Sequence, residues 1–331
     1  MKTCLPTAHR QPARSGLASR SISIRLSNVT LQHRRYRRSG LGRLIFPGLA
    51  LILMAGCSSS TPKLTGPGVS YQNAKDFFSR GHSANYEHAL DTLATLSSAD
   101  PPNEYTDRAR VLRAIILSGE FEGFKRLAEA YERGSGKARE PGVKPEYEGL
   151  YRDTSRRAGE ISLGFAEAAM QLTKGGQIPK GLTLDAPYPV TLASVSSPTL
   201  DKVESGKKIG EYEQSEAALG ASGMGIAKAL SEVVGGDTDT VKSKMNAGPV
   251  PLDSAKFGLF LANELASSAS LFDKKHVYDP GKYRQLVGLA QDAGHAVEAA
   301  LKENPDPDTE KHLKDLDEQL KAGLKASRTA S

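Results

Sequence analysis

Residues 71–102 read YQNAKDFFSRGHSANYEHALDTLATLSSADPP, and this stretch decides the fold. Before Gly81, the apolar residues stand on one short helical face. After Gly81, they recur at positions i, i+3, i+4, i+7 and i+10, which is the spacing of one face of an α-helix. The two faces consist of Ala74, Phe77 and Phe78 and of Tyr86, Ala89, Leu90, Leu93 and Leu96. Because Pro101-Pro102 ends the second helix, the stretch predicts a helical hairpin.

A second pair of apolar stripes follows in residues 104–134. Gly119 separates the two stripes and Gly134 ends the second one, and glycine is common where a helix stops. We therefore expect another hairpin in series with the first, with its turn at Gly119. The stripes consist of Ala109, Leu112 and Ile116 and of Phe121, Phe124, Leu127, Ala128 and Tyr131.

The first hairpin resembles a tetratricopeptide repeat, in which small residues lie where two helices cross, aromatic residues fill the gaps and a proline closes the unit. The residues that carry the resemblance are Ala74, Phe77, Tyr86, Ala89, Leu93, Leu96 and Pro101. The second unit departs from the pattern, with Phe124 at a position that is usually small and no closing proline. A generic pair of α-hairpins is the alternative.

The resemblance implies hairpins stacked in the manner of a right-handed α-solenoid over residues 71–176, with a concave groove. Its candidate lining residues are aromatic side chains that the alternative would place in the core. They are Phe77, Tyr86, Phe121, Phe124, Tyr131 and Tyr147.

The remainder of the chain is also predicted to be mainly helical. Residues 147–172 give the clearest single helix, and residues 177–198 break the pattern around Pro187 and Pro189. This segment predicts an extended loop or a small β-hairpin near 178–198, and we expect any specific contact outside the helices there. Residues 199–331 predict a C-terminal helical region that ends in a bundle, so the fold class is all-α.

The sequence also indicates where helices begin and where they are interrupted in that C-terminal region. Ser197-Pro198 begins a helix by serine capping followed by proline, and Asp279-Pro280 and Asp306-Pro307 begin two more. The glycines between 206 and 225 indicate that the helix either breaks there or approaches a neighbouring helix closely.

A different signal precedes the helices. Residues 44–55 are uncharged and mostly apolar, but crossing a bilayer as a helix takes roughly 20 residues, so they indicate a signal peptide core. The stretch Leu53-Met54-Ala55-Gly56-Cys57 that closes it resembles the lipobox of bacterial lipoproteins. The resemblance implies removal of residues 1–56, acylation of Cys57 (palmitate included) and a flexible tether over 57–70. Ser58 after the cysteine implies delivery to the outer membrane, facing the periplasm.

The leader is long for a bacterial signal, which we attribute to an over-long start; an organelle transit peptide or a twin-arginine signal at Arg37-Arg38 is the alternative. It also changes the charge of the chain. Residues 1–56 hold ten of the 44 Lys and Arg and none of the 38 Asp and Glu, so residues 57–331 carry about four net negative charges. Nucleic-acid binding therefore loses its main support.

The sequence motifs that would indicate nucleotide binding, nucleophilic catalysis or metal binding are incomplete in this chain. Gly134-Ser135-Gly136-Lys137 lacks the rest of a phosphate-binding loop, and the segment Gly220-Ala221-Ser222-Gly223-Met224 lacks the last glycine of a nucleophile elbow, so we expect Ser222 to be a packing residue. The histidines after Cys57 form no zinc pattern; they are His82, His88, His276, His295 and His312. Asp237 and Asp306 begin no complete calcium loop and are expected to cap helices.

We thus expect no enzyme, no catalytic residue, no cofactor and no metal. The predicted function is a periplasmic lipoprotein, held in the bilayer by acylated Cys57, that binds or scaffolds a protein, a peptide or a small hydrophobic ligand. One alternative is an accessory solute-binding component of a periplasmic transporter, because the helical-repeat lipoproteins of such transporters are similar in outline. A second alternative is a cell-envelope enzyme, which would need two carboxylates converging in one cleft.

Overall fold

The hairpin predicted from residues 71–102 is present. The computed structural model describes residues 66–194, 197–273 and 276–328, and the lipobox lies outside them. Helix α1 spans Pro67–Arg80 and α2 spans Ser83–Ser97, and the ring centroids of Phe78 and Tyr86 lie 5.9 Å apart between them. Because proline is favoured in the first helical turn, the last four residues of the predicted tether belong to α1.

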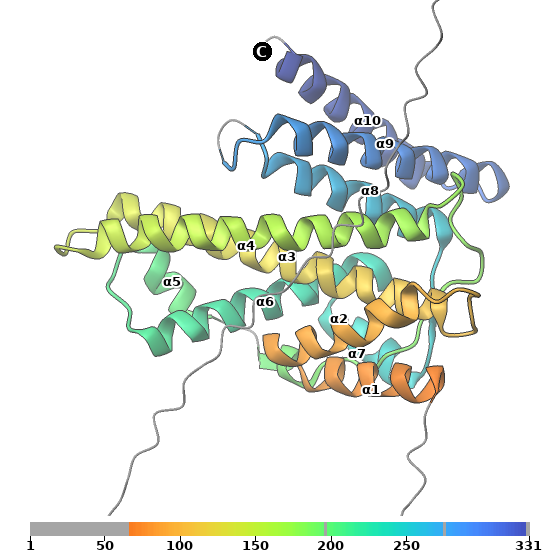
Figure 1. The fold of residues 1–331 in the computed structure, drawn as a ribbon, viewed down its shortest axis with the longest axis horizontal. Coiled ribbons are helices and arrows are strands. Elements are labelled where there is room, and N and C mark those ends of the chain that lie inside the picture. Colours follow the sequence, from red (N-terminus) through yellow and green to blue (C-terminus); the bar gives the residue numbers. More distant parts are fainter. Residues whose placement is uncertain (1–65, 195–196, 274–275, 329–331) are drawn as a thin grey trace, which may run out of the picture. The chain divides into compact units, whose positions relative to one another are not determined.

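The second predicted hairpin is wrong, because α3 runs without a turn from Thr106 to Lys137 and pairs with α4, Val143–Leu172. This long pair crosses the middle of Figure 1. A Cβ on Gly119 would lie 2.6 Å from the Cα of Ile226 in α6. The glycine therefore permits a close helix crossing and not a turn.

The glycine-rich segment after Ser197 forms two helices separated by a break, and the second helix packs closely against α3. Helix α5 spans Pro198–Glu204, and the Ser197 side chain caps it by accepting a hydrogen bond from the backbone N of Leu200 at 3.2 Å. Helix α6, Glu211–Val234, begins after a break and crosses α3 where Gly225 faces Gly119 and Gly123. The short α7, Thr238–Ala247, was not foreseen and is capped by Asp237, as expected of that residue.

The extended segment supplies one strand of a small antiparallel β pair and a 3-10 turn. Strand β1, Thr183–Leu184, pairs with β2, Val250–Pro251, so the second strand comes from beyond α7. The turn η1 spans Val190–Ser194. This pairing attaches the loop to the segment that leads into α8.

The three C-terminal helices are confirmed as α8, Ser254–Ser270, α9, Pro280–Glu303, and α10, Pro307–Arg328. The Asp279 carboxylate caps α9 by accepting hydrogen bonds from the backbone N of Gly281 and of Lys282, both at 3.1 Å. These helices lie above the α3–α4 pair in Figure 1, and α5 and α6 lie below it.

One apolar core connects the first helices to the last ones. Phe165 of α4 meets Phe260 of α8 edge to face at a centroid distance of 6.4 Å, and both side chains are buried. A smaller cluster joins α3, α4, α5 and α6 around Tyr131 and Tyr147. The fold is therefore all-α with one small β pair. Among the described residues, no helix combines the length and hydropathy needed to cross a bilayer.

Candidate functional site

A half-open cavity of about 380 Å³ lies where the extended loop meets α2 and α6, and we call it the loop pocket. Three separate segments supply its walls. The turn before α2 and α2 itself supply His82 and Tyr86. The loop and the start of α5 supply Thr191, Leu192, Ser197, Pro198 and Thr199. Helix α6 supplies Glu216, Leu219 and Ser222. The segment in which we expected a specific contact thus forms one wall.

Two glycines hold the loop against these helices. Gly81, between α1 and α2, has φ 69°, and the Thr191 side chain occupies the space that a Cβ there would need. On α6, a Cβ on Gly220 would lie 2.7 Å from the Cβ of Ser197. Larger residues at either glycine would push the loop away from the pocket.

His82 is the non-glycine residue with a left-handed φ, 68°, among the described residues. Its ψ of 143° places it outside the left-handed helical region, so the conformation is strained for a residue with a Cβ, and such strain is concentrated at functional sites. This strained residue, His82, therefore lies in the wall of the loop pocket.

The Tyr86 hydroxyl is the least satisfied polar group of the pocket. The side chain is 1% exposed, and its oxygen has no hydrogen-bond partner among the described residues. Thr191 lies close enough to this oxygen to lower the pKa of Tyr86. Burial and then the charge of Glu120 raise the pKa of Tyr86. A buried hydroxyl without a partner costs about 1–3 kcal/mol, which a bound polar group would recover.

Ser222 connects the pocket to a carboxyl group in the core. Its hydroxyl donates a hydrogen bond to Glu120 of α3, which is 5% exposed. Burial raises the pKa of Glu120 to about 7, although the Ser222 hydrogen bond and the charge of Arg157 oppose the rise. Sequence reasoning took Ser222 for a packing residue and missed Glu120. The available signal was a carboxylate between Gly119 and Phe121, directly after the apolar run Ala114–Leu117.

Three exposed apolar side chains lie at or next to lining residues of the pocket, and we call them the rim: Leu219 lines it, Val190 precedes Thr191, and Tyr212 contacts Glu216. Val190 at the start of η1 is 75% exposed, and Tyr212 and Leu219 on α6 are 76% and 40% exposed. Tyr212, Glu216 and Leu219 follow one another at i, i+4 and i+7, so they share one face of α6. The Tyr212 hydroxyl is held by Glu216, which raises the pKa of Tyr212.

The six aromatic residues predicted to line a groove lie mostly in the core. Phe77 and Phe124 are half-buried. The other four, Tyr86, Phe121, Tyr131 and Tyr147, are at most 2% exposed. Tyr86 is the one of the six that lines the loop pocket.

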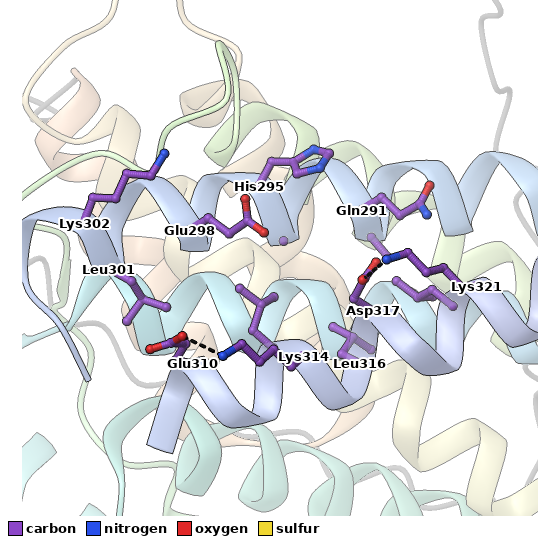
Figure 2. Close-up of a pocket in the computed structure, with 14 residues that line it drawn as sticks. Gln291, His295, Glu298, Leu301, Lys302, Glu310, Lys314, Leu316, Asp317 and Lys321 are labelled. Carbon is purple, nitrogen blue, oxygen red and sulfur yellow. Dashed lines mark hydrogen bonds and ion pairs between the residues drawn. The ribbon is translucent and has the colours of Figure 1, made fainter. Parts of the chain in front are cut away.

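A larger hollow of about 690 Å³ lies between α9 and α10. Figure 2 shows that charged side chains form its walls, and Glu310 pairs with Lys314 at 2.8 Å while Asp317 pairs with Lys321. The leucines on its α10 side, Leu313, Leu316 and Leu320, are only 5–8% exposed. Because four of its charged side chains form two ion pairs and its leucines are covered, this groove offers a ligand less than the loop pocket does.

A buried ionic cluster joins α3, α6 and α8. The hydroxyl of Ser118 donates to Glu264 at 2.9 Å, and Lys228 Nζ lies 2.8 Å from Glu122 and 3.9 Å from Glu264. Burial raises the pKa of Glu264, which is 3% exposed, to about 8. Burial acts in the same direction on Glu122 and is the largest single influence, but the hydrogen bond and charge of Lys228, the charge of Lys125 and the Ser267 hydrogen bond together lower the pKa of Glu122. The cluster fixes the helix crossing.

Metal-binding groups of three or more His, Cys, Asp or Glu side chains do not occur within residues 66–194, 197–273 and 276–328. The loop pocket and its rim, which combine an unsatisfied hydroxyl, a strained backbone and exposed apolar groups, are therefore our candidate site. No protein-family model, curated protein or solved structure matches the chain.

Proposed function

We propose that this chain is a lipid-anchored protein of the cell envelope that binds a protein partner through the loop pocket and its rim. The observation that supports this most strongly is the exposure of Leu219, which lines the cavity, together with that of Val190 and Tyr212, which neighbour its lining residues Thr191 and Glu216. Tyrosine is enriched at the centre of protein interfaces, and apolar groups gathered around a pocket mark such sites more often than scattered ones do.

The position of Glu216 favours binding over acid–base chemistry at this pocket. A pair of catalytic carboxylates would influence one another's ionisation. The groups that shift the pKa of Glu120 are its buried surroundings, Ser222, Arg157 and Glu87, and Glu216 is not one of them. Glu216 instead accepts a hydrogen bond from Thr199 at 3.3 Å.

The proposed anchor would keep the site near its membrane. Helix α1 begins at Pro67, so ten residues separate it from the N-terminal end of the proposed anchor residue, and ten residues span about 35 Å at most. Polar, glycine- and proline-containing segments of this kind do not pack a core.

Replacing Cys57 with serine is expected to release the protein from the membrane fraction, because the thiol is the proposed site of acylation. Mass spectrometry of detergent-extracted wild-type protein should find a lipid-modified N-terminal peptide that begins at Cys57. An unmodified peptide spanning Gly56 and Cys57 in the mature protein would contradict the anchor.

A photo-reactive amino acid at Val190 or at Tyr212 is expected to form a discrete cross-linked product with one partner in intact cells. Tyr278, which is 58% exposed in the turn between α8 and α9, provides the matched control position. The product should be absent at Tyr278 and should weaken when Leu219 is changed to aspartate. Failure of both rim positions to cross-link in membrane-attached protein would rule out this binding surface.

A further inference from the structure

We infer that the loop pocket receives a cationic side chain, Lys or Arg, from the partner protein. This inference rests on the proposed function and names the chemistry of the group that enters the pocket. Three observations support this inference: the charge of the pocket walls, the direction of the hydrogen bonds that their hydroxyl groups make, and the apolar groups beside them.

The walls hold no fixed positive charge. The lining residues include neither Lys nor Arg, and Glu216 contributes a carboxylate beside the cavity. Behind the wall, the Ser222 hydroxyl is bonded to the buried carboxyl group of Glu120. The charge of Glu216 would therefore repel an anionic group here and attract a cation.

The hydroxyl groups of the pocket offer oxygen acceptors. Ser222 donates its hydrogen to Glu120 and Thr199 donates its hydrogen to Glu216, so the lone pairs of both oxygens are free to accept. The Tyr86 oxygen is buried at the cavity without a partner. An ammonium group brings three donors and a guanidinium group five, so either suits this set of acceptors.

The apolar groups suit the rest of such a side chain. Leu192, Pro198 and Leu219 line the pocket beside the oxygens, and a Lys or Arg stem packs on apolar surface while its head makes polar contacts. The exposed ring of Tyr212, one turn before Glu216, adds a surface over which a cation can lie. The volume of about 380 Å³ is within the range of ligand sites.

Methyl NMR on the full-length, detergent-solubilised protein tests the inference. Titration with N-acetyl-lysine amide or N-acetyl-arginine amide is expected to shift the Leu192 and Leu219 methyl resonances saturably. N-acetyl-norleucine amide, which has a similar stem without the charge, is expected to bind at least about tenfold more weakly, and N-acetyl-glutamate amide should not compete.

Two variants separate a binding role from a structural one. Glu216→Gln and Tyr86→Phe should each weaken binding of N-acetyl-lysine amide by about tenfold, whereas Glu211→Gln on the same helix should not. Because Tyr86→Phe removes an unsatisfied buried hydroxyl, its melting temperature should equal or exceed that of the wild type. Reduced binding in a protein that remains folded would therefore report on the site itself.

Equal binding of the norleucine and lysine probes, or unchanged lysine binding in Glu216→Gln, would overturn the inference. Tighter binding of putrescine than of the lysine probe would assign the pocket to a free diamine and overturn the assignment to a partner side chain. Cross-linking at Tyr212 without any cation binding would refute this inference alone. Cation binding without cross-linking would support the cation site and count against the proposed function.

Discussion

The Gly225→Ala variant is expected to lose about 3 kcal/mol or more of the free energy of unfolding, because α3 and α6 touch through their backbones at this point. An added Cβ would overlap the carbonyl oxygen of Gly119 and lie 2.7 Å from the backbone N of Gly123. Backbone atoms cannot rotate away as a side chain can, so the two helices would have to separate. Urea denaturation followed by circular dichroism measures the loss.

Gly149→Ala is the matched control for that variant. Gly149 also lies inside a helix, α4, and a Cβ there would meet nothing within 4 Å. Alanine at this position should therefore stabilise the protein by roughly 0.5–1 kcal/mol through helix propensity. If Gly225→Ala unfolded at the wild-type urea midpoint, the close crossing of α3 and α6 would be excluded.

The free energy of unfolding is expected to fall by about 6 kcal/mol between pH 5 and pH 9. In the folded protein, burial raises the pKa of Glu264 to about 8 and that of Glu120 to about 7, against an ordinary value of 4.5. Between pH 4.5 and these raised pKa values, the folded state binds more protons than the unfolded state, so the two groups stabilise the fold most at low pH. This stabilisation is lost as the pH rises through 7 and 8.

Glu264→Gln should flatten this pH profile, because glutamine resembles the protonated carboxyl group and keeps an acceptor for Ser118. Glu160→Gln, an exposed position on α4, should leave the profile unchanged. Urea midpoints measured from pH 5 to pH 9 provide the comparison. Identical midpoints for the wild type at both ends of that range would show that Glu264 and Glu120 are not buried in neutral form.

Much of the fold could be predicted because helical periodicity and capping are local. The apolar spacing in residues 71–102 predicted α1 and α2, and Ser197 and Asp279 cap α5 and α9 as their sequence positions indicated. Gly119 misled us because a glycine between two apolar stripes has the same local appearance in a turn and in a helix crossing. Its partner, Gly225, lies far along the chain.

The candidate site could be predicted only in part. The extended segment 177–198 does supply one wall of the loop pocket. The other walls depend on which face of α6 packs against that segment, and periodicity does not reveal this for a helix with so many small residues. Glu120 was missed because its neighbours are ordinary core residues, and its partner Ser222 belongs to a different helix.

The loop pocket takes its walls from segments as distant in sequence as Tyr86 and Ser222. Nascent or partly unfolded chains therefore cannot display it, even when individual helices have formed. A partner that recognises this surface would bind fully folded copies of the protein and not partly folded ones. Binding would therefore also test whether the protein has folded.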